Sequence, residues 1–460
     1  MTDRLQADVV VIGGGPSGVA AAAAARHASG GSASVVLVDD GPFGPRPVAA
    51  RSIAALLREA ADAGLTWSQA RAAAAAALGD TADPDAPALA GVRVLAGRAS
   101  LGPGRVDVEP ADPEADPVRV TTRRVVLATG SAPALPDVTG LAETRYVTPD
   151  TLLDLADLPQ TVAVVGAGRR GTALAQALAR LGATVTLVDG EDRPLARFDP
   201  DAAALVEAAL RKDGVRLLIG SPVVKVAPTL DDGAWVGTEA GNDVAAELLV
   251  VATGRRADLA RLDLPSAKVA VGKRGWVTTD DRLRTSNHDV LAVGPVAGRR
   301  HDLPMARLAG ANAVARLRAA RWTPEPLVVS VPTDPPVAAV GVAEPEAVGR
   351  PDAAVHELLG PAGLVRLVTT TGRDARLLGA TAAADDAADV ATAAVLAITA
   401  GLPPHRIADL AEPGTALSTI AKALAREPRR PGTAPRPYGD DAVPPQRQAT
   451  TRDARTRSAG

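Results

Sequence analysis

Two glycine-rich turns, about 150 residues apart, set the strongest constraint on how this chain can fold. Residues 13–18 read Gly-Gly-Gly-Pro-Ser-Gly and follow the apolar run 8–12. Residues 166–171 read Gly-Ala-Gly-Arg-Arg-Gly and follow the apolar run 161–165. An apolar strand, a Gly-x-Gly-x-x-Gly turn and a helix, in this order, predict a βαβ unit that binds a dinucleotide. The sequence therefore predicts two such units.

In the first βαβ unit, the glycines allow a tight turn and a close approach to a pyrophosphate, and the N–H groups of the following helix attract the charge of this pyrophosphate. The candidate binding residues of this turn are Gly13, Gly15, Pro16, Ser17 and Gly18. Asp39 ends the next predicted strand, 21 residues after Gly18. This spacing suits a carboxylate that hydrogen-bonds an adenosine ribose.

The second βαβ unit has the same pattern. Its candidate binding residues are Gly166, Gly168, Arg169, Gly171 and Asp189. A carboxylate at position 189 favours a free 2′-hydroxyl, so we expect NADH rather than NADPH, although Arg193 and Arg197 could reduce this preference. Arg169 and Arg170 oppose the dipole of the predicted helix. They therefore suit contact with a pyrophosphate, or they are solvated arginines.

Composition excludes several classes of function. The chain has 460 residues and no cysteine, so it has no disulfide, thiolate nucleophile or cysteine metal site. Its five histidines share no metal-ligand spacing, and we expect no metal. A net charge of −3 and 2% aromatic residues do not favour nucleic-acid binding. Because neither a signal peptide nor a run of about 18 apolar residues is present, we expect a cytoplasmic protein without a membrane segment.

Four further motifs, together with the two turns, give the chain a family resemblance. It resembles the pyridine-nucleotide–disulfide oxidoreductases, which include dihydrolipoamide dehydrogenase, mercuric reductase and glutathione reductase. The motifs are residues 128–133, 252–256, 285–294 and 333–341. They add the candidate cofactor-binding residues Thr129, Gly130, Gly254 and Gly294. The resemblance implies FAD at the first turn, a nicotinamide nucleotide at the second, and a homodimer.

The predicted fold is α/β, with two Rossmann-like domains for FAD and NAD and a C-terminal α+β dimerisation domain. Residues 1–150 and 271–325 are expected to form the FAD-binding domain, and residues 151–270 the NAD(P)-binding domain. Residues 326–427 form the predicted dimerisation domain. Residues 428–460 are rich in proline and arginine, and we expect a disordered tail. Local patterns predict helical structure over 52–79, 386–399 and 416–426, and strands over 327–331, 337–340 and 364–369.

The stretch that would carry the family's Cys-x4-Cys loop, residues 41–52, contains no cysteine. The two family cysteines would fall at Pro45 or Arg46 and at Ala50 or Arg51. In place of a dithiol, these two arginines could meet an acidic substrate or stabilise reduced flavin, or they are solvated.

The charged groups that support this thiol chemistry in the family are also replaced. The lysine position falls near Ala54, its glutamate partner at Ala173, and the C-terminal His–Glu pair near Gly414 and Thr419. His405 lies several residues before this pair as a weaker alternative base. We therefore assign no catalytic residue.

The flavin motif itself departs from the family at one point. Its closing Gly-Asp is Gly294-Pro295 here, and proline supplies neither a carboxylate nor a backbone N–H. The histidine that usually follows is replaced by Arg307. The loss of one charge-assisted hydrogen bond should weaken the binding of FAD by about one to two powers of ten.

Two hypotheses follow from these observations. The leading one is an FAD-dependent NAD(P)H oxidoreductase that passes a hydride from NADH to the flavin and then electrons to a small non-disulfide acceptor, such as a quinone, a nicotinamide or oxygen. The alternative is a catalytically degenerate, flavin-free relative that acts as a nucleotide-binding or regulatory protein, or that uses both nucleotide sites for flavin-free chemistry. The intact turns favour the first hypothesis, and Pro295 favours the second.

Overall fold

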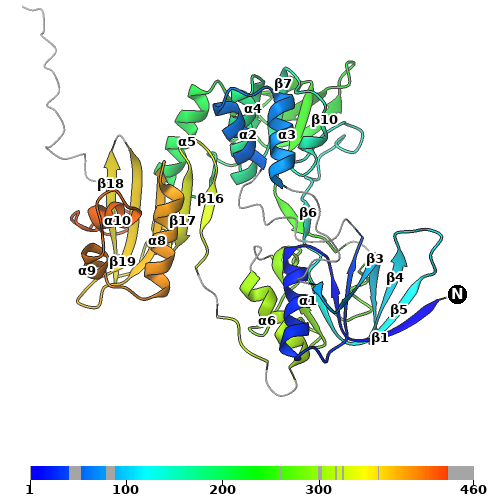
Figure 1. Cartoon of the computed structure of the whole chain (residues 1–460). Coiled ribbons are helices and arrows are strands. Elements are labelled where there is room, and N and C mark those ends of the chain that lie inside the picture. Colours follow the sequence, from blue (N-terminus) through cyan, green and yellow to red (C-terminus); the bar gives the residue numbers. More distant parts are fainter. Residues whose placement is uncertain are drawn as a thin grey trace, which may run out of the picture. The chain divides into compact units, whose positions relative to one another are not determined.

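The computed structural model describes residues 2–40, 53–78, 89–259, 262–298, 303–315, 319–323, 326–360 and 362–433. The chain divides into two compact units, residues 1–337 and residues 338–460 (Figure 1). The first unit contains two sheets built on parallel strands, and the second contains an antiparallel meander with helices. The predicted α/β class with a C-terminal α+β unit is confirmed.

The first sheet contains the strand that leads into the first glycine turn. Its strands are, in spatial order, β1 (Asp3–Ile12), β2 (Val35–Asp39), β3 (Val92–Gly102), β4 (Arg105–Pro110), β5 (Val118–Leu127) and β15 (Val290–Ala292). Strand β1 also pairs in parallel with β5, whereas β4 is antiparallel to both of its neighbours. The central parallel strands therefore end together at one edge of the sheet.

Side chains of β1 alternate between two apolar layers, as strand geometry requires. Val9 and Val11 belong to the layer beneath α1 (Pro16–Ala28) and α6 (Leu303–Val314). Val10 belongs to the layer on the other face of the sheet. Figure 1 shows α1 and α6 side by side against this sheet. Burial on both faces explains why the sequence of β1 is an uninterrupted apolar run from Val9 to Ile12.

The second sheet repeats this plan around the second glycine turn. Its parallel strands are, in spatial order, β13 (Leu248–Val251), β7 (Thr161–Val165), β8 (Thr184–Val188) and β9 (Arg216–Leu218). Its helices are α4 (Arg169–Arg180) and α5 (Pro200–Lys212). A small antiparallel sheet packs its apolar side chains against β7 and β13. Its strands are β10 (Val223–Pro228), β11 (Ala234–Thr238) and β12 (Val244–Ala246).

Within residues 52–79, predicted as helical, the described part forms two helices. These are α2 (Ile53–Asp62) and α3 (Trp67–Leu78). Gly64 lies between them with φ +70°, a left-handed conformation that ends a helix. Helix α2 packs against α4.

Shorter elements complete the first unit. Strands β6 (Ser131–Pro133) and β14 (Arg255–Ala257) follow β5 and β13 and pair with each other in antiparallel fashion. Single 3-10 turns are formed by η2 (Leu152–Asp154) and η3 (Gly294–Ala297). Strand β16 (Val329–Val331) lies near the end of this unit. The β6–β14 pair joins the segments that leave the two parallel sheets.

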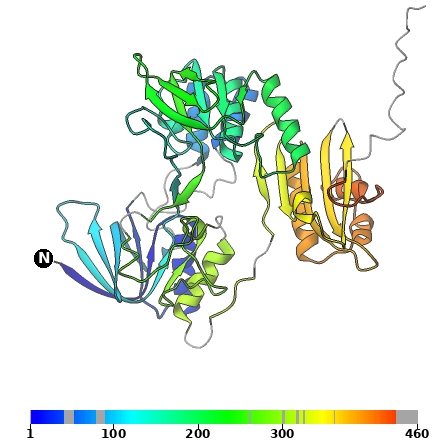
Figure 2. The ribbon, with the colours of Figure 1, turned by 180° about the vertical axis from the view of Figure 1, so that it is seen from behind.

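In the second unit, helices cover one face of a sheet (Figures 1 and 2). The strands are, in spatial order, β17 (Val337–Gly341), β20 (Leu377–Ala384), β19 (Gly363–Thr370) and β18 (Ala353–Gly360). The helices are α7 (Glu344–Ala347), α8 (Ala387–Thr399), α9 (Pro404–Asp409) and α10 (Ala416–Leu424). The predicted strands and helices of this region match β17, β19, α8 and α10, whereas β18 and β20 were not predicted.

The predicted domain boundaries near residues 150, 270, 325 and 427 remain predictions. Ordered contacts do extend past residue 428, because the described chain continues to residue 433 and Arg429 pairs with Val355 of β18. Across the described residues, no helix combines the length and the apolar character that a membrane crossing needs.

A buried cluster of ion pairs holds the last described segment on the second unit. Arg429 donates to Glu344 at 2.7 Å and to Glu357 at 3.2 Å, and Arg366 lies 3.2 Å from the same Glu344. The side chain of Arg366 is 4% exposed and that of Arg429 is 10% exposed. Burial alone would raise the pKa of Glu344, but hydrogen bonds from Arg429 and from the Gly432 N–H hold this pKa below its usual value. The cluster is therefore ionised at neutral pH.

We predict that Arg429→Met destabilises the second unit by about 3–5 kcal/mol, because it leaves two buried carboxylates with one guanidinium. The loss of stability should have its full size above the ordinary pKa of a glutamate. It should become smaller as the pH falls through the lowered pKa of Glu344. Urea unfolding at several pH values measures it, with the exposed neighbour Arg430→Met as the control. Equal midpoints for wild type and Arg429→Met would contradict the prediction.

Candidate functional site

The first glycine turn is tightly enclosed by the ends of three strands. Gly13 has φ +110°, and a Cβ at this position would lie 2.3 Å from the carbonyl oxygen of Ala128, after β5. Its N–H donates to Val38 of β2 at 2.8 Å. A Cβ on Gly18 would lie 1.7 Å from the carbonyl oxygen of Gly13. Only glycine fits at these two positions, so the turn has the shape that the motif predicts.

The other side of the turn is open. A Cβ on Gly15 would meet no heavy atom within 4 Å among the described residues. Gly15 is also the N-cap of α1 and has no capping side chain, so the first N–H groups of the helix have no such partner. Pro16 is the first helical residue. Asp39 lies beside the turn, because a Cβ on Gly14 would come 2.5 Å from its Oδ2. This arrangement places anion-binding N–H groups and a carboxylate at one edge of the sheet.

Three predicted residues from later in the chain belong to the same compact unit as the first turn. Gly294 follows β15 with φ +72°, and a Cβ there would come 2.7 Å from Oγ of Ser17. Gly130 follows β5 with φ +80°. The Thr129 hydroxyl donates to the carbonyl oxygen of Asp258 at 2.8 Å. Gly294 therefore lies against the first turn, whereas the Thr129 side chain joins two segments that leave the sheets.

The second glycine turn repeats the geometry of the first. Gly166 has φ +108° and approaches the backbone of Ala252, and a Cβ on Gly171 would lie 1.8 Å from the carbonyl oxygen of Gly166. Gly168 is the N-cap of α4, again without a capping side chain, and its Cβ position is open. Gly254 follows β13 with φ +123°. The second turn thus presents the same uncapped helix and open side as the first.

Asp189 directly follows β8 and holds the second turn. One of its carboxylate oxygens accepts from the N–H of Ala167, inside the turn, and the other accepts from the backbone N–H of Glu191 at 2.9 Å. The predicted ribose-binding acid is therefore next to the glycines, as the motif requires. Its carboxylate also fixes the shape of the turn.

Positive charge gathers at the start of α4. Arg169 is the first residue of this helix and is exposed. Arg170 and Arg255 share the carboxylate of Asp150, at 3.4 Å and 2.5 Å, and Arg255 also donates to Ser131 at 2.7 Å. Burial, and then repulsion by Arg255, lowers the pKa of Arg170. Sequence reasoning named Arg169 and Arg170 and included Arg255 in a family motif without giving it a role. It missed Asp150, because nothing in the spacing of this residue links it to the turn.

The positions that carry the charged groups of thiol chemistry in the family that this chain resembles hold no charged side chain among the described residues. Residues 41–52 are outside the described residues. Ala54 and Ala173 are buried on α2 and α4, two helices that pack together. Gly414 is exposed, and the Thr419 hydroxyl donates to Asp386 at 3.1 Å. These four positions supply no acid–base pair.

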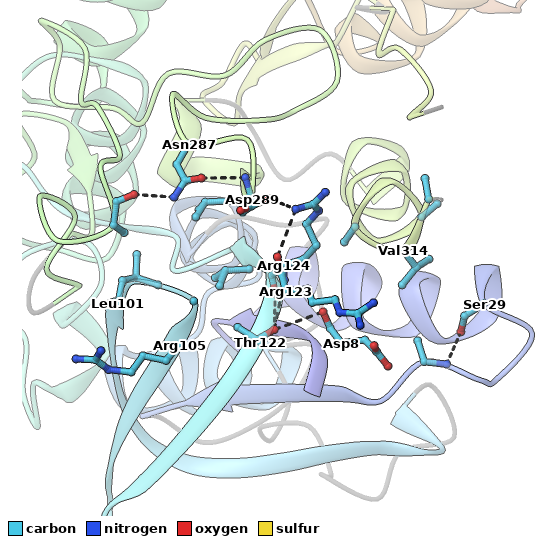
Figure 3. A pocket seen from close by; sticks show the side chains of 18 of the residues that line it. Asp8, Ser29, Leu101, Arg105, Thr122, Arg123, Arg124, Asn287, Asp289 and Val314 are labelled. Atoms are coloured by element: carbon cyan, nitrogen blue, oxygen red, sulfur yellow. Dashed lines mark hydrogen bonds and ion pairs between the residues drawn. The ribbon is translucent and has the colours of Figure 1, made fainter. Parts of the chain in front are cut away.

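A hollow of about 1160 Å³ lies away from the predicted binding residues, none of which lines it. Figure 3 shows Arg123 and Arg124 of β5 near its centre. Arg124 is paired with Asp289, and Arg105 with Asp107 at 2.9 Å. The hollow is therefore a feature separate from the two glycine turns.

Fold and site together define a two-dinucleotide flavoprotein architecture. The sequence profile of the pyridine nucleotide-disulphide oxidoreductase family matches residues 7–313. This chain belongs to that family.

Curated relatives include mercuric reductases. That of Bacillus cereus is 31% identical over 324 residues, which is 66% of this chain and 51% of that protein. That of Streptomyces lividans is 31% identical over 360 residues, which is 73% of this chain and 74% of that protein. The chain covers 51–60% of the length of the first three such relatives.

Solved structures show the same fold along most of the chain. The Cu(II) complex of the HOCl-induced flavoprotein disulfide reductase RclA from Escherichia coli matches with a TM-score of 0.80 and 22% identity, covering 91% of this chain and 99% of that one. LpdA from Mycobacterium tuberculosis matches with a TM-score of 0.77 and 24% identity, covering 92% and 99%. At these identities the likeness concerns the fold.

We predict that Gly18→Ala destabilises the first unit by about 1–3 kcal/mol, because the added methyl group would overlap the carbonyl oxygen of Gly13. Gly15→Ala is the matched control. Its methyl group meets open space, so it should cost less stability but weaken dinucleotide binding. Thermal unfolding and calorimetric titration with FAD measure the two effects. A Gly18→Ala protein that unfolds with the wild type would contradict this account of the turn.

Proposed function

We propose that this protein is an FAD-dependent NADH oxidoreductase that passes electrons to a small non-disulfide acceptor: a quinone, a second nicotinamide nucleotide or oxygen. The family is one of FAD-dependent pyridine nucleotide oxidoreductases. The observation that carries the proposal is the pair of glycine turns with matching geometry in a chain of 460 residues without cysteine. Hydride transfer between two cofactors needs both turns, whereas dithiol exchange needs thiols.

The residues of the first turn fit FAD. Gly15 leaves the backbone open to a pyrophosphate, and Asp39 lies beside the turn for the adenosine ribose. The hydroxyl of Ser17 is buried at this turn and has no hydrogen-bond partner among the described residues. A polar ligand supplies such a partner. When bound, FAD supplies the centre that takes up a hydride and releases electrons to an acceptor.

The chain's own residues bind and orient the nicotinamide nucleotide. The uncapped start of α4 faces the pyrophosphate, and the neighbouring guanidiniums of Arg170 and Arg255 neutralise it. Asp189 accepts from the ribose hydroxyls and repels a 2′-phosphate, which supports NADH over NADPH. Catalysis then consists mainly of positioning, with no side chain assigned to proton transfer.

Thiol chemistry has no support in this chain. A disulfide acceptor or a soft metal ion is handled by thiolates, and the chain has none. The lysine and glutamate positions of the family are the buried Ala54 and Ala173. We therefore do not extend the disulfide or mercuric reductase activity of the relatives to this chain.

A second candidate function is favoured by Pro295. A relative that has lost FAD would act as a nucleotide-binding or regulatory protein, or would carry out flavin-free chemistry between its two nucleotide sites. Pro295 lacks the N–H and the carboxylate that the second flavin motif supplies in the family. This candidate keeps both turns but predicts no flavin.

We also propose that the protein is a homodimer, because members of the family are generally homodimers. The C-terminal α+β region, residues 326–427, is the proposed dimerisation domain. Its partners would otherwise be small molecules, without nucleic acid or membrane.

The visible spectrum of the purified protein, with FAD offered, tests the proposed function directly. We expect a flavin band at nearly one equivalent that bleaches when NADH is added without oxygen, because both nucleotides are bound in one chain. Free FAD mixed with NADH at the same concentrations is the control. Absence of a flavin band would favour the flavin-free candidate.

Coenzyme choice is tested with Asp189→Ala. Removal of the carboxylate should lower the ratio of NADH to NADPH affinity about tenfold, because the repulsion of a 2′-phosphate and one ribose hydrogen bond are lost. Titration calorimetry with each coenzyme measures the ratio. Glu191→Ala removes an equal charge two residues away and should leave the ratio unchanged. An unchanged ratio in Asp189→Ala would overturn the role of this carboxylate.

A further inference from the structure

The buried hydroxyl of Ser17 has no explanation in the folded chain alone. Ser17 is the second residue of α1 and is 3% exposed. Its Oγ accepts and donates no hydrogen bond among the described residues. Burying an unpaired hydroxyl is unfavourable, and unpaired groups of this kind in native proteins usually have a ligand or water as partner. The second residue of a helix gains nothing from a serine that makes no bond.

The position of this hydroxyl connects the two flavin motifs. Ser17 belongs to the first motif, and the Cβ position of Gly294, in the second motif, lies 2.7 Å from Ser17 Oγ. Gly294 is buried and follows β15, whose carboxyl end lies at the same edge of the sheet as the ends of β1 and β5. A side chain at position 294 would therefore cover the hydroxyl, and glycine leaves it uncovered.

The next residue, Pro295, is the point at which a binding group is missing. It is the second residue of the 3-10 turn η3 and has neither an N–H nor a polar side chain. A ligand that passes between α1 and the end of β15 therefore receives no N–H donor and no side-chain contact of a polar kind from residue 295. The nearest polar side-chain atom that the described residues place against Gly294 is Ser17 Oγ.

We propose that Ser17 Oγ hydrogen-bonds an oxygen of FAD in the stretch that links the adenosine to the isoalloxazine ring, and that it replaces the anchor missing at Pro295. This inference rests on the proposed function, because it requires that FAD binds at the first turn. Ser17 is then a positioning residue for the flavin in this chain. The hydrogen bond that Pro295 does not make in the second flavin motif is replaced by one from Ser17 in the first.

A ligand contact and a structural role predict opposite signs for one measurement. If Ser17 Oγ is unpaired without FAD, Ser17→Ala removes an unsatisfied buried group, and the apoprotein should unfold at a higher temperature than wild type. The same variant should bind FAD about tenfold more weakly, which corresponds to one lost hydrogen bond. A serine that stabilises the helix itself would lower the unfolding temperature of the apoprotein instead.

The experiment uses the full chain freed of nucleotide. Wild type, Ser17→Ala and Ser418→Ala are compared by thermal unfolding without FAD and by quenching of flavin fluorescence during titration with FAD. Ser418 is the matched control, since it is a buried serine whose hydroxyl donates to Thr415 at 2.8 Å. Ser418→Ala should lower the unfolding temperature and leave the FAD affinity unchanged.

A second variant tests the compensation itself. Pro295→Asp restores a carboxylate to the second motif, and in the Ser17→Ala protein it should recover most of the lost FAD affinity. If the wild type binds FAD and Ser17→Ala binds it equally well, the contact is wrong while the proposed function stands. If the wild type does not bind FAD at all, both the contact and the proposed function fail.

Discussion

The approach of two backbone segments without a side chain between them is the constraint on which both binding units depend. Gly13 lies against the backbone after β5, and Gly166 lies against the backbone after β13. The surrounding hydrogen bonds also correspond, since Gly13 donates to Val38 and Gly166 donates to Val188, each at 2.8 Å. Any methyl group at these points would separate the strands that shape the turn. The two sheets are therefore two solutions to the same steric problem in one chain.

This constraint explains why the sequence alone predicted the position of both glycine turns. A turn that admits only glycine, between an apolar strand and a helix, gives a recognisable spacing, and the structure has Asp39 at the end of β2 and Asp189 directly after β8. Strands β18 and β20, which the sequence did not predict, depend on their surroundings rather than on a local pattern. Strand β20 reads Leu-Leu-Gly-Ala-Thr-Ala-Ala-Ala, and alanine favours helices when considered alone. It is a strand because its residues are buried between β17 and β19.

Contacts between distant charges were also beyond the sequence. Arg429 falls in a proline- and arginine-rich segment that looks solvated, yet it is buried against Glu344 and Glu357. Arg255 and Asp150 meet beside α4 although about a hundred residues separate them. No local pattern marks such pairs, because their energy depends on burial that only the folded chain provides. Candidate residues in glycine turns can therefore be read from the sequence, and their charged neighbours cannot.

The carboxylate of Asp189 has a consequence for how this chain could evolve. Because one of its oxygens accepts a hydrogen bond from the N–H of Ala167, the residue proposed to discriminate between coenzymes also stabilises the turn. A substitution that changed the coenzyme would loosen the loop that receives it, and the change would need a second mutation to restore the loop. If Asp189 sets the proposed preference for NADH, a change of coenzyme at this position therefore requires two substitutions rather than one.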